Sequence, residues 1–201
     1  MDSLEDIEAE IRRCKKCELW KTKTNYVPGE GNSKAELVFI GEAPGREEDR
    51  QGRPFVGNAG KLLTEMIEKI GLRREDVFIG NILKCRPPNN RDPLPEEIKA
   101  CSPYLIRQLD AIKPSVIACL GRYSASFIFS LFGLEFKGIS RDRGKVKEVE
   151  KWGKKVKLIA IYHPAAVLYR PQLRQTFEED FSTIASLLRE KRRNPTLFDF
   201  M

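Results

Sequence analysis

Short apolar segments alternate with longer amphipathic segments along most of the chain. The apolar runs are rich in branched side chains, as expected of strands buried on both faces; they are Leu37–Ile40, Val77–Leu83, Val116–Leu120 and Val156–Tyr162. Apolar residues recur at helical spacing in Asn58–Ile70, Glu96–Ile112, Arg122–Phe132 and Gln172–Arg189. This alternation predicts an α/β fold in which helices cover both faces of a parallel sheet.

Polar and glycine residues mark the ends of two expected helices. Ser3 and Asp6 resemble a capping box, which predicts a short helix from there to Cys14. Asn58 is expected to cap the start of the next helix, and Gly71 to follow its end as the C′ residue.

The second half of the chain contains a helix breaker and two strongly polar segments. Pro103 falls inside a long helical pattern, so that helix is expected to be kinked or to start later. The charged segment 140–155 is expected to form a solvated hairpin or loop. We expect one domain over residues 1–189, followed by a C-terminal tail at 190–201.

Composition narrows the class of protein. The 201 residues are 41% hydrophobic, enough for a packed core, and carry a net charge of +7. No apolar run approaches the roughly 20 residues that span a bilayer, and the acidic, amphipathic start does not resemble a signal peptide. A cytoplasmic monomer is therefore expected. The basic charge favours a polyanionic partner, most simply nucleic acid. The 32% of charged residues is also typical of thermophile proteins.

Four of the five cysteines have the spacing of ligands. Cys14 and Cys17 form a C-x2-C pair in a basic turn, which favours thiolates, whereas Cys85 and Cys101 form a wide pair around a proline-rich loop. Four thiolates suit structural zinc or an iron–sulfur cluster, and the wide second pair favours the cluster. Alternatively, Cys85 and Cys101 are core thiols, which would leave the C-x2-C pair unexplained. Cys119 lies inside an apolar run and is expected to be a core residue.

Polar residues also follow the apolar runs, where active sites of parallel α/β folds lie. The first run is followed by Gly41 to Gly45 (GEAPG), and Glu42 within it would repel a phosphate. Phe55 lies in a glycine-flanked loop, where it can stack on a flat ring or cover the core. Asn81 lies inside an apolar run, where its amide can read a base edge or bond to the backbone. His163, the only histidine, directly follows the last run.

Together these residues resemble the family 4 uracil-DNA glycosylases, the iron–sulfur branch of their superfamily. The similarity covers roughly residues 14–188, and its motifs are specific only in combination; they are the four cysteines, GEAPG, GRPFVG at 52–57, Asn81-x3-Cys85-Arg-Pro-Pro and His163-Pro-Ala. The resemblance implies a three-layer α/β/α sandwich with a central four-stranded parallel sheet. It also implies a [4Fe–4S] cluster on Cys14, Cys17, Cys85 and Cys101.

The resemblance further implies that the protein excises uracil from single- or double-stranded DNA. The implied pocket consists of Gly41, Glu42, Ala43, Phe55, Asn81 and His163. In it, Phe55 would stack on the flipped base and the Asn81 amide would read its edge. His163 would donate to the leaving uracil, and Glu42, assisted by Glu48, would orient the water. The best-known branch has a catalytic Asp at the position of Ala43, so the water-activating residue stays open.

Further positions are candidates for contacts with DNA and with a partner protein. Val167 or Leu168 could fill the gap left by the flipped base, Arg170 could hold a phosphate, and Asn90 lies in the cluster loop. The tail resembles a sliding-clamp-binding peptide, with its apolar anchors at Leu197, Phe198 and Phe200. Two other functions remain open: a non-catalytic iron–sulfur DNA-binding module and, less favoured, an electron carrier.

Overall fold

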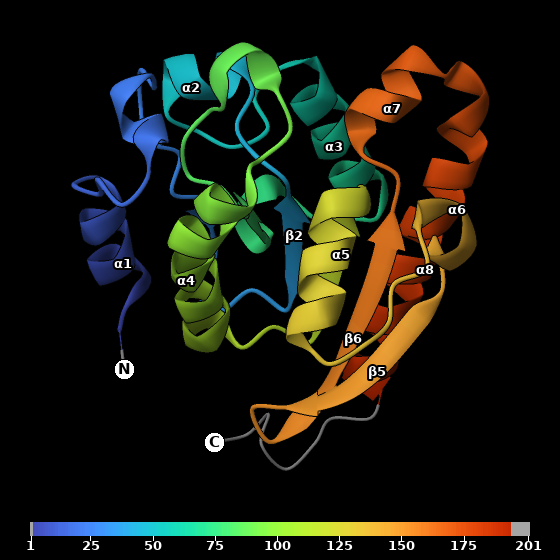
Figure 1. Ribbon diagram of the computed structural model, residues 1–201. Coiled ribbons are helices and arrows are strands. Elements are labelled where there is room, and N and C mark those ends of the chain that lie inside the picture. The colour runs from blue at the N-terminus through green and yellow to red at the C-terminus, as the bar shows by residue number, and fades with distance from the viewer. Residues whose placement is uncertain (1, 194–201) are drawn as a thin grey trace.

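The computed structural model describes residues 2–193, and for 190–193 the backbone only. A six-stranded sheet forms its centre, with the order β1-β3-β2-β4-β6-β5 (Figure 1). The strands are β1 (Glu30–Gly31), β2 (Leu37–Gly41), β3 (Phe78–Asn81), β4 (Val116–Leu120), β5 (Val146–Lys151) and β6 (Lys154–Ile161). The four inner strands are parallel, as predicted, while β1 and β5 pair antiparallel at the two edges.

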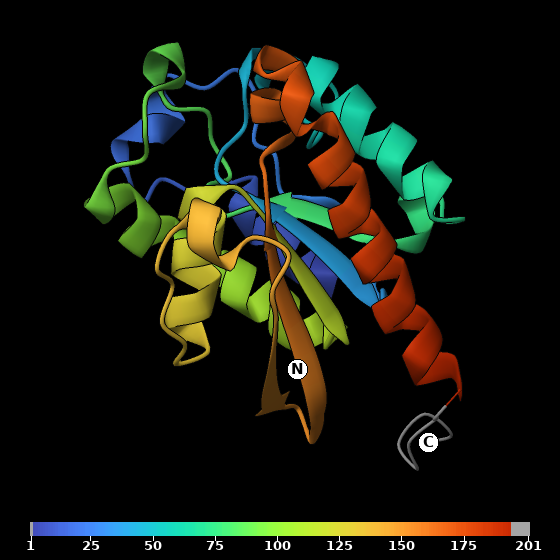
Figure 2. The same cartoon turned by 90° about the vertical axis from the view of Figure 1, so that its right-hand side faces the viewer.

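Helices cover both faces of the sheet, which confirms the three-layer α/β/α sandwich (Figures 1 and 2). The longer helices are α1 (Leu4–Ile11), α3 (Asn58–Lys69), α4 (Pro95–Ile112), α5 (Arg122–Leu131) and α8 (Arg174–Arg193). Short helices are α2 (Arg46–Gln51), α6 (Ile139–Asp142) and α7 (Pro164–Tyr169), with 3-10 turns η1 (Glu18–Lys21), η2 (Arg74–Asp76), η3 (Pro88–Asn90) and η4 (Pro171–Leu173).

Alternation of side chains along the strands builds two separate cores. In β2, Leu37 and Phe39 face α3 and α8, whereas Val38 and Ile40 face α4 and α5. The expected core residue Cys119 is fully buried in β4. A third, smaller core joins α1 to α4 and contains Cys85 and Cys101.

Several predicted boundaries hold and others are wrong. The Ser3–Asp6 capping box is present, but its helix ends at Ile11, before Cys14. Gly71 follows α3 with a positive φ of 81°, as expected, whereas the N-cap is Gly57 and Asn58 is the first helical residue.

The second half shows similar differences. Helix α4 begins at Pro95 and continues past Pro103, so the prediction that it starts after this proline is wrong. Pro103 is exposed, and water can therefore bond to the helix carbonyl oxygen that lacks a partner because proline has no N–H group. Segment 140–155 contains most of the β5–β6 hairpin. Helix α8 continues to Arg193, past the expected start of the tail at residue 190, and the anchors Leu197, Phe198 and Phe200 lie outside the described residues. In residues 2–193 no helix is long and apolar enough to cross a membrane.

Candidate active site

A cavity of about 450 Å³ opens where β2, β3 and β6 end. Because these strands are parallel, their carboxyl ends lie at the same edge of the sheet and bring together residues far apart in the chain. The cavity is lined by Glu42, Ala43, Pro44, Gly45, Glu48, Phe55, Ala59, Asn81, Pro87, Asn90, Arg91, His163, Ala165 and Tyr169. Except for Gly41, every residue expected to form the pocket lines it, and Gly41 lies directly behind.

Asn81 is the last residue of β3, paired with Gly41 at the end of β2. The Asn81 side chain is buried, and its Oδ1 has no hydrogen-bond partner among the described residues. A Cβ atom on Gly41 would lie 2.3 Å from this oxygen and 2.6 Å from the Phe55 ring. Glycine is therefore required at position 41 for the amide and the ring to approach one another. A buried amide oxygen that lacks a partner in the described part of the chain and lies beside a cavity is prepared to accept a hydrogen bond from a ligand.

The Phe55 loop is held in an unfavourable backbone conformation from two sides. Phe55 has a positive φ of 49°, which is strained for a residue with a side chain. Glu48 Oε1 accepts hydrogen bonds from the N–H groups of Val56 and Gly57, both at 2.9 Å. From the other side, Arg74 donates to the carbonyl oxygens of Pro54 and Phe55 at 2.7 and 2.9 Å. These charge-assisted bonds fix the ring in place.

His163 is neutral and can donate a hydrogen bond into the cavity. Its Nδ1 accepts a hydrogen bond from the Ala165 N–H at 3.2 Å, at the start of α7. Burial lowers the pKa of His163 to about 4, so the ring is neutral at pH 7 and carries its proton on Nε2. The ring lies 5.6 Å from the Phe55 ring, centre to centre. The cavity therefore combines a flat apolar face with a neutral N–H donor.

Glu42 follows β2 and is the carboxylate best suited to act on a water molecule. Burial, and secondly the charge of Asp92, raise the pKa of Glu42 to about 7, while Arg122 opposes the shift. A carboxyl group with this pKa is well matched to proton transfer near neutral pH. Glu48 also lines the cavity, but one of its oxygens is engaged by the Phe55 loop. The geometry thus gives Glu48 a role in holding that loop.

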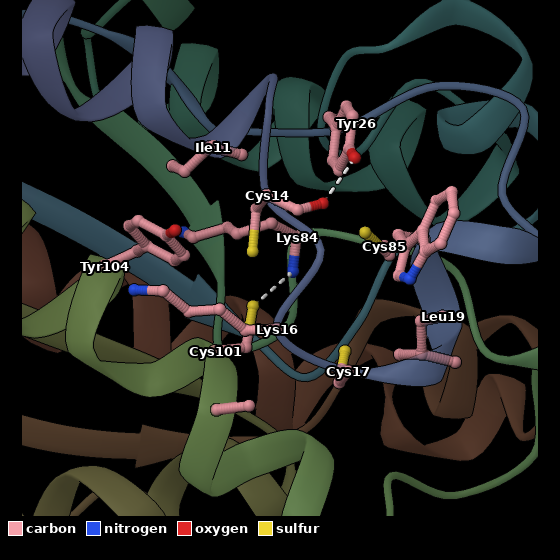
Figure 3. A pocket seen from close by; sticks show the side chains of 12 residues that line it. Ile11, Cys14, Lys16, Cys17, Leu19, Tyr26, Lys84, Cys85, Cys101 and Tyr104 are labelled. Atoms are coloured by element: carbon pink, nitrogen blue, oxygen red, sulfur yellow. Dashed lines mark hydrogen bonds between the residues drawn. The ribbon is translucent and has the colours of Figure 1, made fainter.

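The four paired cysteines line a second cavity, between α1, the 3-10 turn η1 and helix α4 (Figure 3). The Lys84 N–H donates to Cys101 Sγ at 3.2 Å, and the Tyr26 hydroxyl donates to the Cys14 carbonyl. Burial raises the pKa of Cys101 to about 11 and also raises the pKa of Cys85. Thiolates there need a positive partner, as a metal centre provides. No group of three or more His, Cys, Asp or Glu side chains in the described part of the chain is placed to hold a metal ion.

Comparison with known proteins places this arrangement in a family. The family model of the uracil DNA glycosylase superfamily matches residues 28–188. The chain belongs to this superfamily. A type-4 uracil-DNA glycosylase of Archaeoglobus fulgidus is 69% identical over 201 residues, covering 100% of both chains. A type-4 enzyme of Saccharolobus solfataricus is 54% identical over 192 residues (95% of this chain, 89% of the relative), and one of Thermotoga maritima is 41% identical over 190 residues (94% and 96%). The resemblance to family 4 is thereby confirmed, and the chain is a member of this enzyme family.

The residues expected to meet DNA differ in exposure. Val167 is buried in the core between the sheet and α8, whereas Leu168 is 46% exposed and Arg170 is exposed. Of the two wedge candidates, Leu168 is the exposed one. Asn90 lies at the cavity wall and accepts a hydrogen bond from Arg86 at 2.7 Å.

Three residues in or next to this cavity were not predicted from the sequence. Arg74 supports the Phe55 loop, Lys84 lies buried behind Asn81, and Tyr169 is 87% exposed at the cavity rim. An aromatic residue within the motif after His163 was a signal that could have indicated Tyr169. Arg74 and Lys84 gave no such signal, because their partners are distant in the chain or are main-chain atoms.

Proposed function

We propose that this protein is a monofunctional DNA glycosylase that flips uracil out of DNA and hydrolyses its N-glycosidic bond. The observation that carries the proposal is the convergence of four groups in one cavity. They are the Phe55 ring, Glu42, a neutral His163 and Asn81, whose Oδ1 has no partner among the described residues. The cavity volume of about 450 Å³ is within the range of small-molecule sites.

Each group has a role that follows from its chemistry. Phe55 stacks on the flipped base. Asn81 accepts from uracil N3–H and donates to O4; cytosine presents the opposite polarity at both positions, which leaves the buried amide unpaired. His163 donates from Nε2 to O2, where negative charge develops as the base leaves.

The remaining step is attack by water on C1′ of the sugar. Ionised Glu42 orients the water and stabilises the oxocarbenium-like sugar. Ala43 contributes only main-chain atoms, so Glu42 replaces the side chain that this position lacks. The C1′–N1 bond breaks and uracil leaves as an anion that takes up a proton, while the water oxygen bonds to C1′ and the water passes a proton to Glu42.

The proposal includes a [4Fe–4S] cluster on Cys14, Cys17, Cys85 and Cys101. These four side chains surround one cavity, and the Lys84 N–H bond to Cys101 Sγ is typical of the hydrogen bonds that cluster sulfurs accept. A single zinc ion needs its sulfurs about 2.3 Å from one point, whereas a cluster binds each thiolate to a different iron and spreads them apart. When bound, the cluster supplies a cross-link between α1, η1 and α4 rather than a reacting group.

The remaining parts of the proposal concern the surroundings of the pocket. Residues 1–189 act as one domain and 190–201 as a tail that binds a sliding clamp. Leu168 fills the gap in the flipped-out strand, and Arg170 holds a phosphate.

The test is release of uracil from a single-stranded oligonucleotide that carries one uracil, beside a matched thymine oligonucleotide. Wild type should act on the uracil strand alone, and His163→Ala should be slower by about 10²- to 10³-fold, the usual effect of removing one such donor. DNA binding should persist in the variant. Binding without any release by iron-loaded wild type would instead favour the non-catalytic module.

A further inference from the structure

Lys84 is a fully buried lysine that neither the pocket nor the cysteine ligand set accounts for. Its side chain is 1% exposed and lies behind the end of β3. The ammonium donates to the Asn81 carbonyl oxygen at 2.8 Å and to Gln108 Oε1 at 2.7 Å. Burying an ammonium is costly unless hydrogen bonds and an opposite charge compensate it, so its place in the fold calls for a reason.

The sheet register gives the first part of that reason. Strands β1 and β3 pair Glu30 with Ile79 and Gly31 with Phe78, so the same register continued places Pro28 opposite Asn81. Proline has no N–H group, so Pro28 cannot donate to the Asn81 carbonyl. Lys84 donates to it instead, and Gln108 Nε2 donates to the Pro28 carbonyl at 2.9 Å. Lys84 and Gln108 thus donate to the carbonyl oxygens of Asn81 and Pro28, where the regular hydrogen bonds between the two strands are interrupted. These bonds lie next to the Asn81 side chain, which is proposed to read the base.

The second part of the reason is a negative charge near Lys84 that can compensate its buried ammonium. Both hydrogen-bond acceptors of its ammonium, the Asn81 main-chain carbonyl and Gln108 Oε1, are neutral. Lys84 lines the cysteine cavity together with Cys14, Cys17, Cys85 and Cys101, so thiolates that bind a cluster there would place negative charge beside the lysine. Lys84 also donates its main-chain N–H to Cys101 Sγ (Figure 3). Gln108 lies seven residues after Cys101 on the same face of α4. Lys84 therefore contacts the cysteine site through its main-chain N–H and Asn81 through its side chain.

We propose that Lys84 is a positioning residue that fixes the Asn81 main chain for base reading and is held in place by the negative charge of the four-cysteine site. A cluster with four thiolate ligands is the anion that balances the buried ammonium. Loss of the cluster leaves that charge uncompensated and loosens the end of β3. This inference rests on the proposed function, and it gives the cluster a specific effect on base recognition at a distance.

The experiment compares wild type with Lys84→Met, which keeps an unbranched side chain one atom shorter than lysine and removes its charge and donors. Lys16→Met is the matched control, because Lys16 lines the same cysteine cavity but is exposed, 4.7 Å from the centre of the Tyr104 ring. The first readout is the rate of iron release to a chelator. Lys84→Met should release iron about 10- to 100-fold faster than wild type, as for other groups that support metal ligands, and Lys16→Met should match wild type.

The second readout is hydrogen exchange in residues 78–85, measured with and without iron. Removal of iron should deprotect this segment in wild type, and Lys84→Met should be deprotected even with iron bound. The third readout is turnover on the uracil oligonucleotide. Lys84→Met should lose about 10-fold in kcat with KM for DNA unchanged, because the defect lies in base positioning and not in DNA contacts.

The outcomes are distinct. If Lys84→Met behaves like Lys16→Met in iron release, hydrogen exchange and kcat, the proposal is overturned. If wild type binds no iron after reconstitution, the electrostatic part of the proposal is overturned. If wild type binds iron but releases no uracil, the proposed function fails while iron release and exchange still decide the inference. If Lys84→Met does not fold, Gln108→Met is the second variant; it removes the neutral acceptor of Lys84 and the donor to the Pro28 carbonyl. It should show the same changes at smaller size, and wild-type behaviour in all three readouts would overturn the proposal.

Discussion

Addition of a single methyl group at Gly41 should disable the pocket while the fold persists. In Gly41→Ala, the new Cβ would lie 2.3 Å from Asn81 Oδ1 and 2.6 Å from the Phe55 ring, whereas ordinary contact begins at 3.4 Å. The amide or the ring must therefore move by about 1 Å. A misplacement of this size near the reacting groups costs about 10²-fold in rate, or about 2.7 kcal/mol of transition-state stabilisation.

The assay is kcat/KM for uracil release, measured well below the melting temperature of each variant. Gly71→Ala is the control, because its positive φ of 81° makes alanine strained there but its Cβ would meet nothing within 4 Å. That control should lose about 1 kcal/mol of stability and keep wild-type kcat/KM. If Gly41→Ala kept kcat/KM within about 3-fold of wild type, the loss would be far smaller than a 1 Å displacement produces. Glycine at position 41 would then not be needed for close approach of the amide and the ring.

Other expected results follow from the same geometry. Burial raises the pKa of Glu42 to about 7, and its ionised form acts on water, so single-turnover rates should rise with pH through about 7. Glu42→Gln should abolish this rise. A wild-type rate that stays constant between about pH 5 and 9 would contradict the proposed role of Glu42. Asn81→Asp reverses the polarity offered to O4, so uracil release should fall by about 10³-fold and cytosine release should become measurable, as oligonucleotide cleavage at abasic sites would reveal. Arg74→Met removes the bonds that hold Phe55 and should cost about 3 kcal/mol in urea unfolding, whereas the exposed neighbour in Arg73→Met should change little; equal losses would refute the loop-holding role.

Much of the fold could be predicted because buried parallel strands appear in the sequence as unbroken apolar runs. The antiparallel edge strands could not, since β1 has only the two residues Glu30–Gly31 and β5 has lysine or glutamate at four of its six positions. Edge strands have one free side and need no apolar run. The Asn58 cap failed because Gly57 has the extended backbone of the N-cap, one residue earlier than the polar side chain suggested.

The pocket was predicted better than its supports. Asn81, His163 and Glu42 could be predicted because a polar residue at the end of an apolar run is conspicuous. The importance of Arg74 depends on main-chain carbonyls 19 and 20 residues away, and such partners leave no mark on the sequence. The same holds for Lys84, whose role depends on Pro28 lying opposite Asn81 across the sheet.

The chain delivers each working group of the pocket from a different connection: Glu42 after β2, Phe55 between α2 and α3, Asn81 at the end of β3 and His163 after β6. Their positions are set by the ends of the strands, and each group belongs to a separate segment of the chain. Evolution can therefore exchange one loop at a time, and so alter which base is accepted or how water is activated, without rebuilding the sandwich. Alanine at position 43, with the neighbouring Glu42 taking over the water, is what such independent variation of one loop would produce.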